Sequence, residues 1–435
     1  FYNNNNNHQQ PHLHPPSTMS DKAAFTEMGD ANAKLATAES KIKRLTVCAT
    51  ASMIVAVAAL CLAAFAAAGG MKHEGDIGDI TDRMLPLGGV GTAGPEVVLR
   101  VGASASMTGY PSKSSLYDGA GFWTTKKPLP TATSDFAAVH VGDKVYLIGG
   151  QTYFNNTAVG LDTLTMYDTA LEKYSALTKM PEKRMRYGAA VSGGKIFVMG
   201  GLTADGTDQL NTTLIYDIAT NAWTYGPQMV VPRGDTCAAA AGGKIYVVAG
   251  FTTNYATLKS VEVMDPAAAT PVWTKAADLP EPRGDVTCAA SGDKVYALGG
   301  YYDASDTWKA DSFHNSVFEL DAKMAMPTWV TKAPMPTARG DKAAVTLADG
   351  SIVVIGGESH ARNEVTQIAQ HAVEQYFPAH NTWMSKASIP TARFRFAAAA
   401  VGQFIHAFGG HVLCESGWFG NYNDDCAKNT LDSHE

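Results

Sequence analysis

The chain has 435 residues, of which 34 are basic and 41 acidic, so its formal net charge is −7. Charged residues make up 17% of the sequence, below the roughly 25% of typical soluble domains, and glycine is abundant with 41 residues. This composition favours an all-β protein with many tight turns over charged amphipathic helices. The mild acidic balance, without a basic patch, argues against binding of nucleic acid, which requires clustered Lys and Arg.

Residues 1–44 form a polar N-terminal segment that opens with the low-complexity sequence FYNNNNNHQQPHLHPPST. Because such a composition cannot bury a hydrophobic core, we expect a disordered tail. His8, His12 and His14 offer loose metal ligands, but the biased composition around them is the better explanation of these histidines.

No charged residue occurs between Arg44 and Lys72, and residues 45–71 are apolar and rich in alanine. A helix of this length spans about 40 Å, enough to cross a hydrocarbon core of ~30 Å. Basic residues are more numerous before the span than after it, which predicts a cytosolic N-terminus and a translocated C-terminal part. A signal peptide cleaved at the Ala-x-Ala site of residues 64–66 is the alternative, but the apolar region is longer than such a peptide needs. We therefore predict a signal-anchor and a single-pass type II membrane protein.

Residues 72–95 are rich in Gly, Asp and Thr and predict a flexible stalk. Residues 96–435 repeat a unit of about fifty residues, a period that indicates a solenoid or a propeller. Each unit begins with a small apolar strand, a Gly-Asp, Gly-Gly or Asp-Gly turn, and a second strand that ends in a glycine doublet. The doublets are Gly149-Gly150, Gly200-Gly201, Ala249-Gly250, Gly299-Gly300, Gly356-Gly357 and Gly409-Gly410.

A third strand with a Tyr-Asp signature and a fourth strand with an aromatic residue complete each unit. The best copy of the third strand is Leu214–Asp217, whereas Met264 and Phe377 replace the tyrosine in two units. The fourth-strand residues are Tyr174, Trp223, Trp273, Trp329 and Trp383. This order of doublet, tyrosine and tryptophan resembles the kelch repeat. The resemblance implies an all-β fold, a kelch-type β-propeller built from four-stranded blades.

The two ends of the repeat region predict how the ring closes. Residues 114–128 contain a Tyr-Asp pair and Trp123, and so predict a third and a fourth strand, whereas residues 391–410 predict a first and a second strand. Joining them removes an open sheet edge and gives six blades. Seven blades remain the alternative, because residues 97–102 resemble a second strand and residues 428–435 resemble the start of a third.

An arginine precedes the first strand in five successive units, and three of these arginines open an Arg-Gly-Asp triplet. Repetition predicts a ring of alternating charge on one rim of the channel. The first interpretation is ion pairing between blades and turn formation, because arginine is common here in kelch repeats. The second is a rim that binds an anionic or polyhydroxyl ligand, since the arginine fork fits carboxylates. The candidate residues are Arg184, Arg233, Arg283, Arg339, Arg393, Asp235, Asp285 and Asp341.

Three long inserts, residues 301–315, 358–370 and 411–428, are predicted contact elements, because loops on a rigid scaffold usually carry binding. Aromatic side chains in these inserts suit a protein or sugar partner, unless they fold back onto the propeller. They are Tyr301, Tyr302, Trp308, Trp418, Phe419 and Tyr422.

Cys414 and Cys426 bracket a polar insert, and in an oxidising compartment we expect a disulfide that staples this loop. Cys237 and Cys288 occupy similar places on the first strands of neighbouring units. Buried thiols are the first interpretation there, and a geometrically demanding bridge between blades is the alternative.

Two Asn-x-Thr sequons, at Asn155 and Asn211, follow glycine doublets and predict glycosylation.

The sequence has no His pair with metal-ligand spacing and no Gly-x-Ser-x-Gly motif, so it predicts no metal, no cofactor and no catalytic residue. We predict a membrane-tethered propeller that recognises a protein or a glycan on the lumenal or extracellular side. A carbohydrate-active enzyme that works at the channel mouth, similar to sugar epimerases or oxidases, is the alternative. A cytosolic ubiquitin-ligase adaptor, a role of many kelch proteins, is the third hypothesis.

Overall fold

The computed structural model describes residues 98–100, 121–154, 157–302, 312–360, 367–414, 431, 433 and 434. These residues all belong to one unit, Thr92–Glu435. Apart from one short 3-10 helix, η1 (Thr253–Tyr255), the regular elements described are β-strands. The prediction of an all-β propeller is confirmed.

Within the described ranges no helix has the length and the apolar character needed to cross a bilayer. The predicted tail (1–44), membrane span (45–71) and stalk (72–95) lie outside those ranges, so these three remain predictions.

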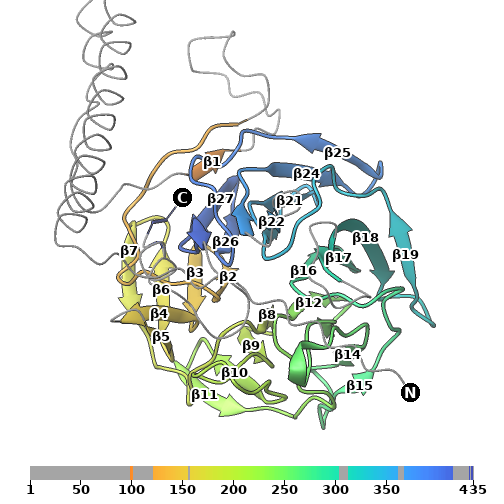
Figure 1. The fold of residues 1–435 in the computed structure, drawn as a ribbon. Coiled ribbons are helices and arrows are strands. Elements are labelled where there is room, and N and C mark those ends of the chain that lie inside the picture. Colours follow the sequence, from red (N-terminus) through yellow and green to blue (C-terminus); the bar gives the residue numbers. More distant parts are fainter. Residues whose placement is uncertain are drawn as a thin grey trace, which may run out of the picture. The chain divides into compact units, whose positions relative to one another are not determined.

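Five antiparallel sheets of four strands form blades around a central axis (Figure 1). From the inside outward, the first blade holds β2 (Ala137–Val141), β3 (Lys144–Ile148), β6 (Leu164–Asp168) and β7 (Lys173–Ala176). The second holds β8 (Gly188–Ser192), β9 (Lys195–Met199), β10 (Thr213–Asp217) and β11 (Ala222–Tyr225). The third holds β12 (Cys237–Ala241), β13 (Lys244–Val248), β14 (Val261–Met264) and β15 (Thr274–Lys275).

The fourth blade holds β16 (Thr287–Ser291), β17 (Lys294–Tyr301), β18 (Phe313–Asp321) and β19 (Trp329–Lys332). The fifth holds β20 (Ala343–Thr346), β21 (Ile352–Ile355), β24 (Val373–Phe377) and β25 (Thr382–Ser385). In each blade consecutive strands are antiparallel neighbours, as expected from the tight glycine turns that join first and second strands.

A sheet of three strands lies between the fifth and the first blade. Its strands are β26 (Ala397–Val401), β27 (Phe404–Phe408) and β1 (Val98–Arg100). Because β1 pairs with β27, with Leu99 opposite Ile405, Val98–Arg100 takes the place of a third strand and not of the predicted second strand. His434 forms an isolated bridge with Phe408 at the other end of β27, and the predicted start of a third strand in residues 428–435 stays a prediction.

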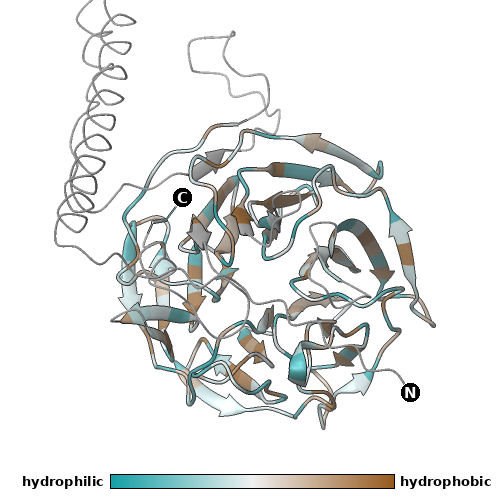
Figure 2. Cartoon of the chain, viewed as in Figure 1, coloured by the Kyte–Doolittle hydropathy of each residue, from teal (hydrophilic) through white to brown (hydrophobic). Residues whose placement is uncertain are grey.

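The innermost strands form a closed ring around the channel. β2, β8, β12, β16, β20 and β26 contact one another in this order, and β26 contacts β2 again. These strands are rich in alanine, because strands that converge on an axis leave room mainly for small side chains. The second strand of each unit is buried on both faces, with Val145, Ile196, Val247 and Ile355 fully inaccessible to solvent. Figure 2 shows the same gradient, since the outer strands β7 and β11 carry less hydrophobic colour than β9 and β21.

Aromatic side chains on the outermost strands bind the preceding blade, which explains the tryptophan signature. The indole N–H of Trp223 donates to the carbonyl of Thr178 at 2.8 Å. Equivalent bonds are Trp273 to Pro227 at 3.1 Å, Trp329 to Ala277 at 2.9 Å, Trp383 to Ala333 at 2.9 Å, Trp123 to Ala387 at 2.9 Å, and the Tyr174 hydroxyl to Lys127 at 3.0 Å.

The inserts after the glycine doublets add two small sheets at one end of the propeller. β4 (Gln151–Phe154) and β5 (Thr157–Gly160) form a hairpin. β22 (Glu358–His360), β23 (Gln367–Ala369) and β28 (Leu413–Cys414) form a three-stranded sheet. Two of the three predicted contact inserts therefore pair with each other.

Candidate functional site at the mouth of the channel

Six equivalent triplets lead into the innermost strands at the doublet end of the propeller. The middle residue of each triplet forms a β-bridge with the residue that follows a doublet, as Gly234 does with Phe251 and Gly340 with Glu358. The doublets and the triplets therefore share one end of the channel. The triplets are Thr133-Ser134-Asp135, Arg184-Met185-Arg186, Arg233-Gly234-Asp235, Arg283-Gly284-Asp285, Arg339-Gly340-Asp341 and Arg393-Phe394-Arg395.

The first residues of these triplets include five arginines that are buried. These entry arginines (Arg184, Arg233, Arg283, Arg339 and Arg393) are at most 1% exposed. The Arg233 guanidinium donates to the carbonyls of Ala249 and Ser260 and pairs with Glu262 at 2.9 Å. Arg339 likewise donates to the Gly356 carbonyl and pairs with Glu374 at 2.5 Å.

These bonds join the entry segment of a blade to the doublet and the third strand of the same blade. The entry arginines are therefore not exposed to a ligand, and the interpretation of them as ligand-binding residues is wrong. The ion pairs given above also lie within one blade, so the expectation that such arginines pair between blades needs the same correction.

The third residues of the triplets form a second set, the inner ring, which faces the channel. It consists of Asp135, Arg186, Asp235, Asp285, Asp341 and Arg395, and all six have a positive φ between 44° and 57°. The backbone links neighbouring members: the N–H of Arg186 donates to the carbonyl of Asp135, that of Asp235 to Arg186, and that of Arg395 to Asp341. Bonds from Asp135 to Arg395 and from Asp341 to Asp285 belong to the same series. The side chains are thus held by a stiff backbone collar.

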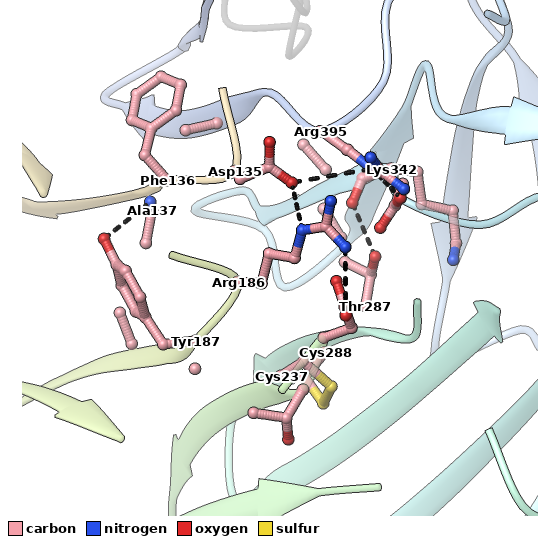
Figure 3. Close-up of a pocket in the computed structure, with 18 of the residues that line it drawn as sticks. Asp135, Phe136, Ala137, Arg186, Tyr187, Cys237, Thr287, Cys288, Lys342 and Arg395 are labelled. Atoms are coloured by element: carbon pink, nitrogen blue, oxygen red, sulfur yellow. Dashed lines mark hydrogen bonds and ion pairs between the residues drawn. A yellow bond between two sulfur atoms is a disulfide. The ribbon is translucent and has the colours of Figure 1, made fainter. Parts of the chain in front are cut away.

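The two arginines of the inner ring neutralise part of its negative charge. Arg186 Nε lies 2.8 Å from Asp135 Oδ1, and Arg395 Nε lies 2.7 Å from Asp341 Oδ2. Figure 3 shows both guanidinium groups reaching toward Asp135. Burial alone would raise the pKa of Asp135, but Arg186, His411 and Arg395 together hold this pKa well below its usual value.

The other acids of the inner ring are crowded and less well compensated. Carboxylate oxygens of Asp235, Asp285 and Asp341 all lie within 4.8 Å of one another. Burial raises the pKa of Asp235 to about 6, although Arg186 opposes the shift. Burial, and then the charges of Asp341 and Asp235, raise the pKa of Asp285 well above its usual value.

Glu358 adds a further acid behind the inner ring. Its side chain is fully buried, and neither carboxylate oxygen has a hydrogen-bond partner among the described residues. Burial and the neighbouring Asp341 raise the pKa of Glu358 to about 8. Lys342, which follows Asp341, is also buried; burial and then Arg339 lower the pKa of its amine to about 7.

A cavity of about 200 Å³ opens inside the inner ring and continues toward the alanine-lined channel. Its lining also includes Thr287 and a disulfide between Cys237 on β12 and Cys288 on β16 (Figure 3). The interpretation of these cysteines as free buried thiols is wrong, and the bridge between blades is present. Their Cα atoms are 5.4 Å apart, because neighbouring innermost strands converge here.

Of the predicted aromatic contact residues, the structure describes Tyr301 and Tyr302. Tyr301 is 2% exposed and packs with Phe251 and Phe313, so it is part of the core and not a free contact residue. Tyr302 is half-buried beside His314, with ring centroids 6.3 Å apart. Trp308, Trp418, Phe419, Tyr422, Asn155 and Cys426 lie outside the described residues.

Two further predicted residues have defined places. Asn211 is half-buried, and its side-chain amide donates to the Met229 carbonyl at 3.1 Å. Cys414 ends β28, and its predicted disulfide to Cys426 remains a prediction.

The sequence analysis did not single out Asp135, Arg186, Arg395 or Glu358. Alignment on the doublets contains the signal for all four, since the first three occupy the third triplet position and Glu358 follows its doublet directly. These residues were missed because the third triplet position holds Asp in some units and Arg in others, although its backbone conformation is the same in all six.

Comparison with known proteins agrees with this architecture. A model of the KLHDC2/KLHL20/DRC7 Kelch-repeats domain matches residues 122–300. Kelch-like protein 41 of Homo sapiens is 31% identical over 86 residues, which are 20% of this chain and 14% of that protein. Kelch-like protein 41b of Danio rerio is 33% identical over 91 residues, 21% of this chain and 14% of that protein. The match thus spans 14% of the length of these relatives.

Among solved structures, that of YjhT superposes with a TM-score of 0.57 at 16% sequence identity. The superposition covers 70% of this chain and 95% of the YjhT chain. At this identity the likeness concerns the fold alone.

Proposed function

Because this chain is a kelch-repeat β-propeller, we propose that it is a protein-recognition module that binds its partner at the channel mouth. The observation that carries the proposal is the charged inner ring, which opens into a cavity of about 200 Å³ at the end where the inserts lie. The opposite end carries short hairpin turns such as Gly292-Asp293. Those turns offer a partner little surface, whereas the mouth combines charge, depth and loops.

Site-specific photo-crosslinking tests which face binds. A photoreactive residue replaces Tyr302 beside the mouth in one variant of the full chain. In another it replaces the exposed Lys244, which follows the hairpin turn Gly242-Gly243 at the opposite end. We expect a discrete crosslinked protein from the Tyr302 position and none from Lys244. Equal crosslinking at both positions, or crosslinking from Lys244 alone, would overturn the assignment of the mouth as the binding face.

We further propose that the propeller is displayed on the lumenal or extracellular side of a membrane, with a protein or a glycan as its ligand. The apolar segment 45–71 and the basic residues before it support this topology. The Cys237–Cys288 disulfide adds support, because disulfides persist mainly in oxidising compartments.

Translation into microsomes, followed by protease protection and endoglycosidase treatment, tests the topology. We expect a protected propeller fragment that loses mass on deglycosylation if Asn155 or Asn211 carries a glycan. A fragment that protease digests fully in intact microsomes would exclude lumenal display and make cytosolic partners the leading hypothesis.

The crowded acids at the mouth favour a second candidate function, a carbohydrate-active enzyme. Acids whose pKa is raised toward neutrality, here Asp235 to about 6 and Glu358 to about 8, are typical of proton-transfer sites. Exchange of sugar C–H protons with deuterium in D₂O tests this candidate. If the protein exchanges these protons and an Asp285→Asn variant does not, the enzyme hypothesis would replace the recognition hypothesis.

We also infer that the ring closes with six blades, with Trp123 on the last outer strand. The bond from Trp123 to Ala387 supports this closure, because it repeats the bond from Trp383 to Ala333. Trp123→Phe removes one hydrogen bond and is expected to lower the free energy of unfolding by ~1 kcal/mol, as Trp383→Phe does. A neutral Trp123→Phe beside a destabilising Trp383→Phe would contradict six-blade closure.

A further inference from the structure

We propose that the inner ring holds a hard divalent cation of the Ca²⁺ type, bound by the carboxylates of Asp235, Asp285 and Asp341. Three blades supply one ligand each, and nothing in the proposed recognition function requires the ion. The site is independent of the partner's identity.

The spacing of the carboxylates fits a single large ion. Their oxygens lie within 4.8 Å of one another. Ca²⁺ is bound by oxygen at about 2.3–2.6 Å, so two ligands on opposite sides of the ion are up to ~5 Å apart. Mg²⁺ requires near-ideal octahedral geometry at about 2.0–2.1 Å and usually keeps several waters, whereas Ca²⁺ accepts about six to eight oxygens in flexible geometry. A site built from carboxylates of three blades therefore favours Ca²⁺.

Glu358 gives a second, independent indication of a missing cation. Its β-bridge partner Gly340 immediately precedes Asp341, so Glu358 and this ligand lie next to each other on the same blade at the mouth of the channel. The charge of Glu358 acts on Asp285, and that of Asp341 acts on Glu358, so the four acids share one electrostatic environment. Both oxygens of this fully buried side chain lack a partner in the described part of the chain. A cation at the inner ring would supply the missing counter-charge directly or through a bound water.

The cations already present do not satisfy this need. Arg186 lies closest to Asp135, at 2.8 Å, and only 3.6 Å from Asp235. Arg395 pairs with Asp341 at 2.7 Å. No ion pair to Asp285 or Glu358 occurs among the residues that the structure describes. The buried amine of Lys342 follows Asp341 in the chain but has no hydrogen-bond partner among the described residues, so it does not pair directly with Asp285 or Glu358. The surplus of negative charge is therefore concentrated where the three blades meet.

The ligands are also held in place before an ion binds. All three aspartates have a positive φ, and the backbone collar joins Asp235 to Arg186 and Asp341 to Asp285. Asp235 and Asp285 are joined instead by the disulfide between Cys237 and Cys288, which lies two to three residues after them in the chain. A preorganised set of oxygens loses little conformational freedom on binding.

Calorimetric titration of the full chain, purified in detergent and freed of metal with a chelator, tests the site with CaCl₂ as the probe. We expect one Ca²⁺ per chain, a higher melting temperature with Ca²⁺, and weaker binding of MgCl₂. Asp285→Asn is expected to lower the affinity at least about tenfold. Asp293→Asn is the matched control, because it makes the same change in an exposed turn of the same blade, and its affinity should equal that of the unmodified chain.

Glu358→Gln provides a second variant should Asp285→Asn fail to fold. It keeps the shape of the side chain and removes its charge, and we expect weaker Ca²⁺ binding. Three outcomes would overturn the proposal: no uptake of Ca²⁺ at pH 8, equal loss in Asp293→Asn, or unchanged affinity in both Asp285→Asn and Glu358→Gln.

Discussion

The entry arginines and the inner ring come from the same triplets, two residues apart, yet they have opposite environments. Arg339 is fully buried and bonded to Glu374 and to backbone carbonyls, whereas Asp341 faces a cavity with other acids. The entry position is Arg in five of the six triplets, whereas the inner position mixes four Asp with two Arg. The buried arginine that stabilises a blade therefore recurs from unit to unit, whereas the charged residue that faces the channel changes sign between units.

The backbone accounts for this difference. Four of the five entry arginines donate to the carbonyl of the first doublet residue, as Arg393 does to Gly409 at 2.8 Å, whereas Arg283 donates to the Ser316 hydroxyl. The inner position instead has a positive φ that directs its side chain to the mouth, where no acceptor is shared among blades. The backbone acceptor therefore favours arginine at the first triplet position, whereas the third position accepts either a positive or a negative side chain.

Removal of the disulfide should have the largest effect and should act on the inner ring. In the described chain, backbone hydrogen bonds join every pair of neighbours in the inner ring except Asp235 and Asp285. The Cys237–Cys288 disulfide links the two strands that follow this unbonded pair. The double change Cys237→Ser and Cys288→Ser is expected to lower the free energy of unfolding by about 4 kcal/mol, given the sequence separation of 51. Urea denaturation measures the loss.

Hydrogen exchange of backbone amides distinguishes a local from a general effect in this variant. Faster exchange near Asp235 and Asp285, with unchanged exchange near Arg339 and Arg393, would agree with the comparison of the two sets. Uniformly faster exchange would show that the bridge stabilises the whole ring and not the mouth.

The buried pairs of the entry arginines come next in size. Glu374→Gln leaves the Arg339 charge buried without its counter-ion and is expected to cost about 3 kcal/mol of unfolding free energy. Glu281→Gln is the matched control, because Glu281 pairs with the equivalent Arg283 at 2.6 Å but is 54% exposed. We expect less than about 1 kcal/mol for this control. Equal losses in urea denaturation would mean that burial does not decide the strength of these pairs.

The sequence predicts the scaffold of this protein well, because its signals are local and repeated. The turn before Lys244, the doublet at Gly250 and the outer Trp273 each have a physical task that the structure confirms. The inner ring was only partly predictable, since Asp235, Asp285 and Asp341 share a motif and Arg186 and Asp135 do not. Distances between blades are absent from sequence, so neither the disulfide nor the crowding of the three carboxylates could be derived from it.

The third effect is the dependence of the unfolding free energy on pH, which reports on the acids at the inner ring and not on the entry arginines. The folded protein holds a proton on Glu358 up to a pKa of about 8, against 4.5 for the unfolded chain. Between these values the folded state binds more protons, so stability falls as the pH rises, by up to ~1.4 kcal/mol per pH unit for this group. The stabilising contribution is complete below pH 4.5 and lost above pH 8.

Lys342 has the opposite sign, but in another range. Its lowered pKa of about 7, against the usual 10.5, makes stability fall as the pH drops from 10.5 to 7. Below pH 7 both states carry this charge, so Lys342 does not contribute between pH 5 and pH 7, where the lowered pKa values of the buried His406, His411 and His434 oppose the effect of the acids. In metal-free protein, the slope of the unfolding free energy against pH is expected to be more positive in Glu358→Gln than in the unmodified chain, and an unchanged slope would contradict the raised pKa of Glu358.

The smallest predicted effect concerns two identical substitutions with opposite outcomes. In metal-free protein at pH 8, Asp285→Asn relieves repulsion from Asp341 and Asp235 and is expected to stabilise the fold. Asp341→Asn loses its bond to Arg395 and is expected to destabilise the fold by about 1 kcal/mol. Melting temperatures measure both, and saturating Ca²⁺ should reverse the sign for Asp285→Asn alone, because the unmodified chain then gains the binding energy that this variant has lost. If both variants change stability in the same direction, with and without Ca²⁺, the inner ring is a structural collar like the entry arginines, and the distinction between the two sets fails.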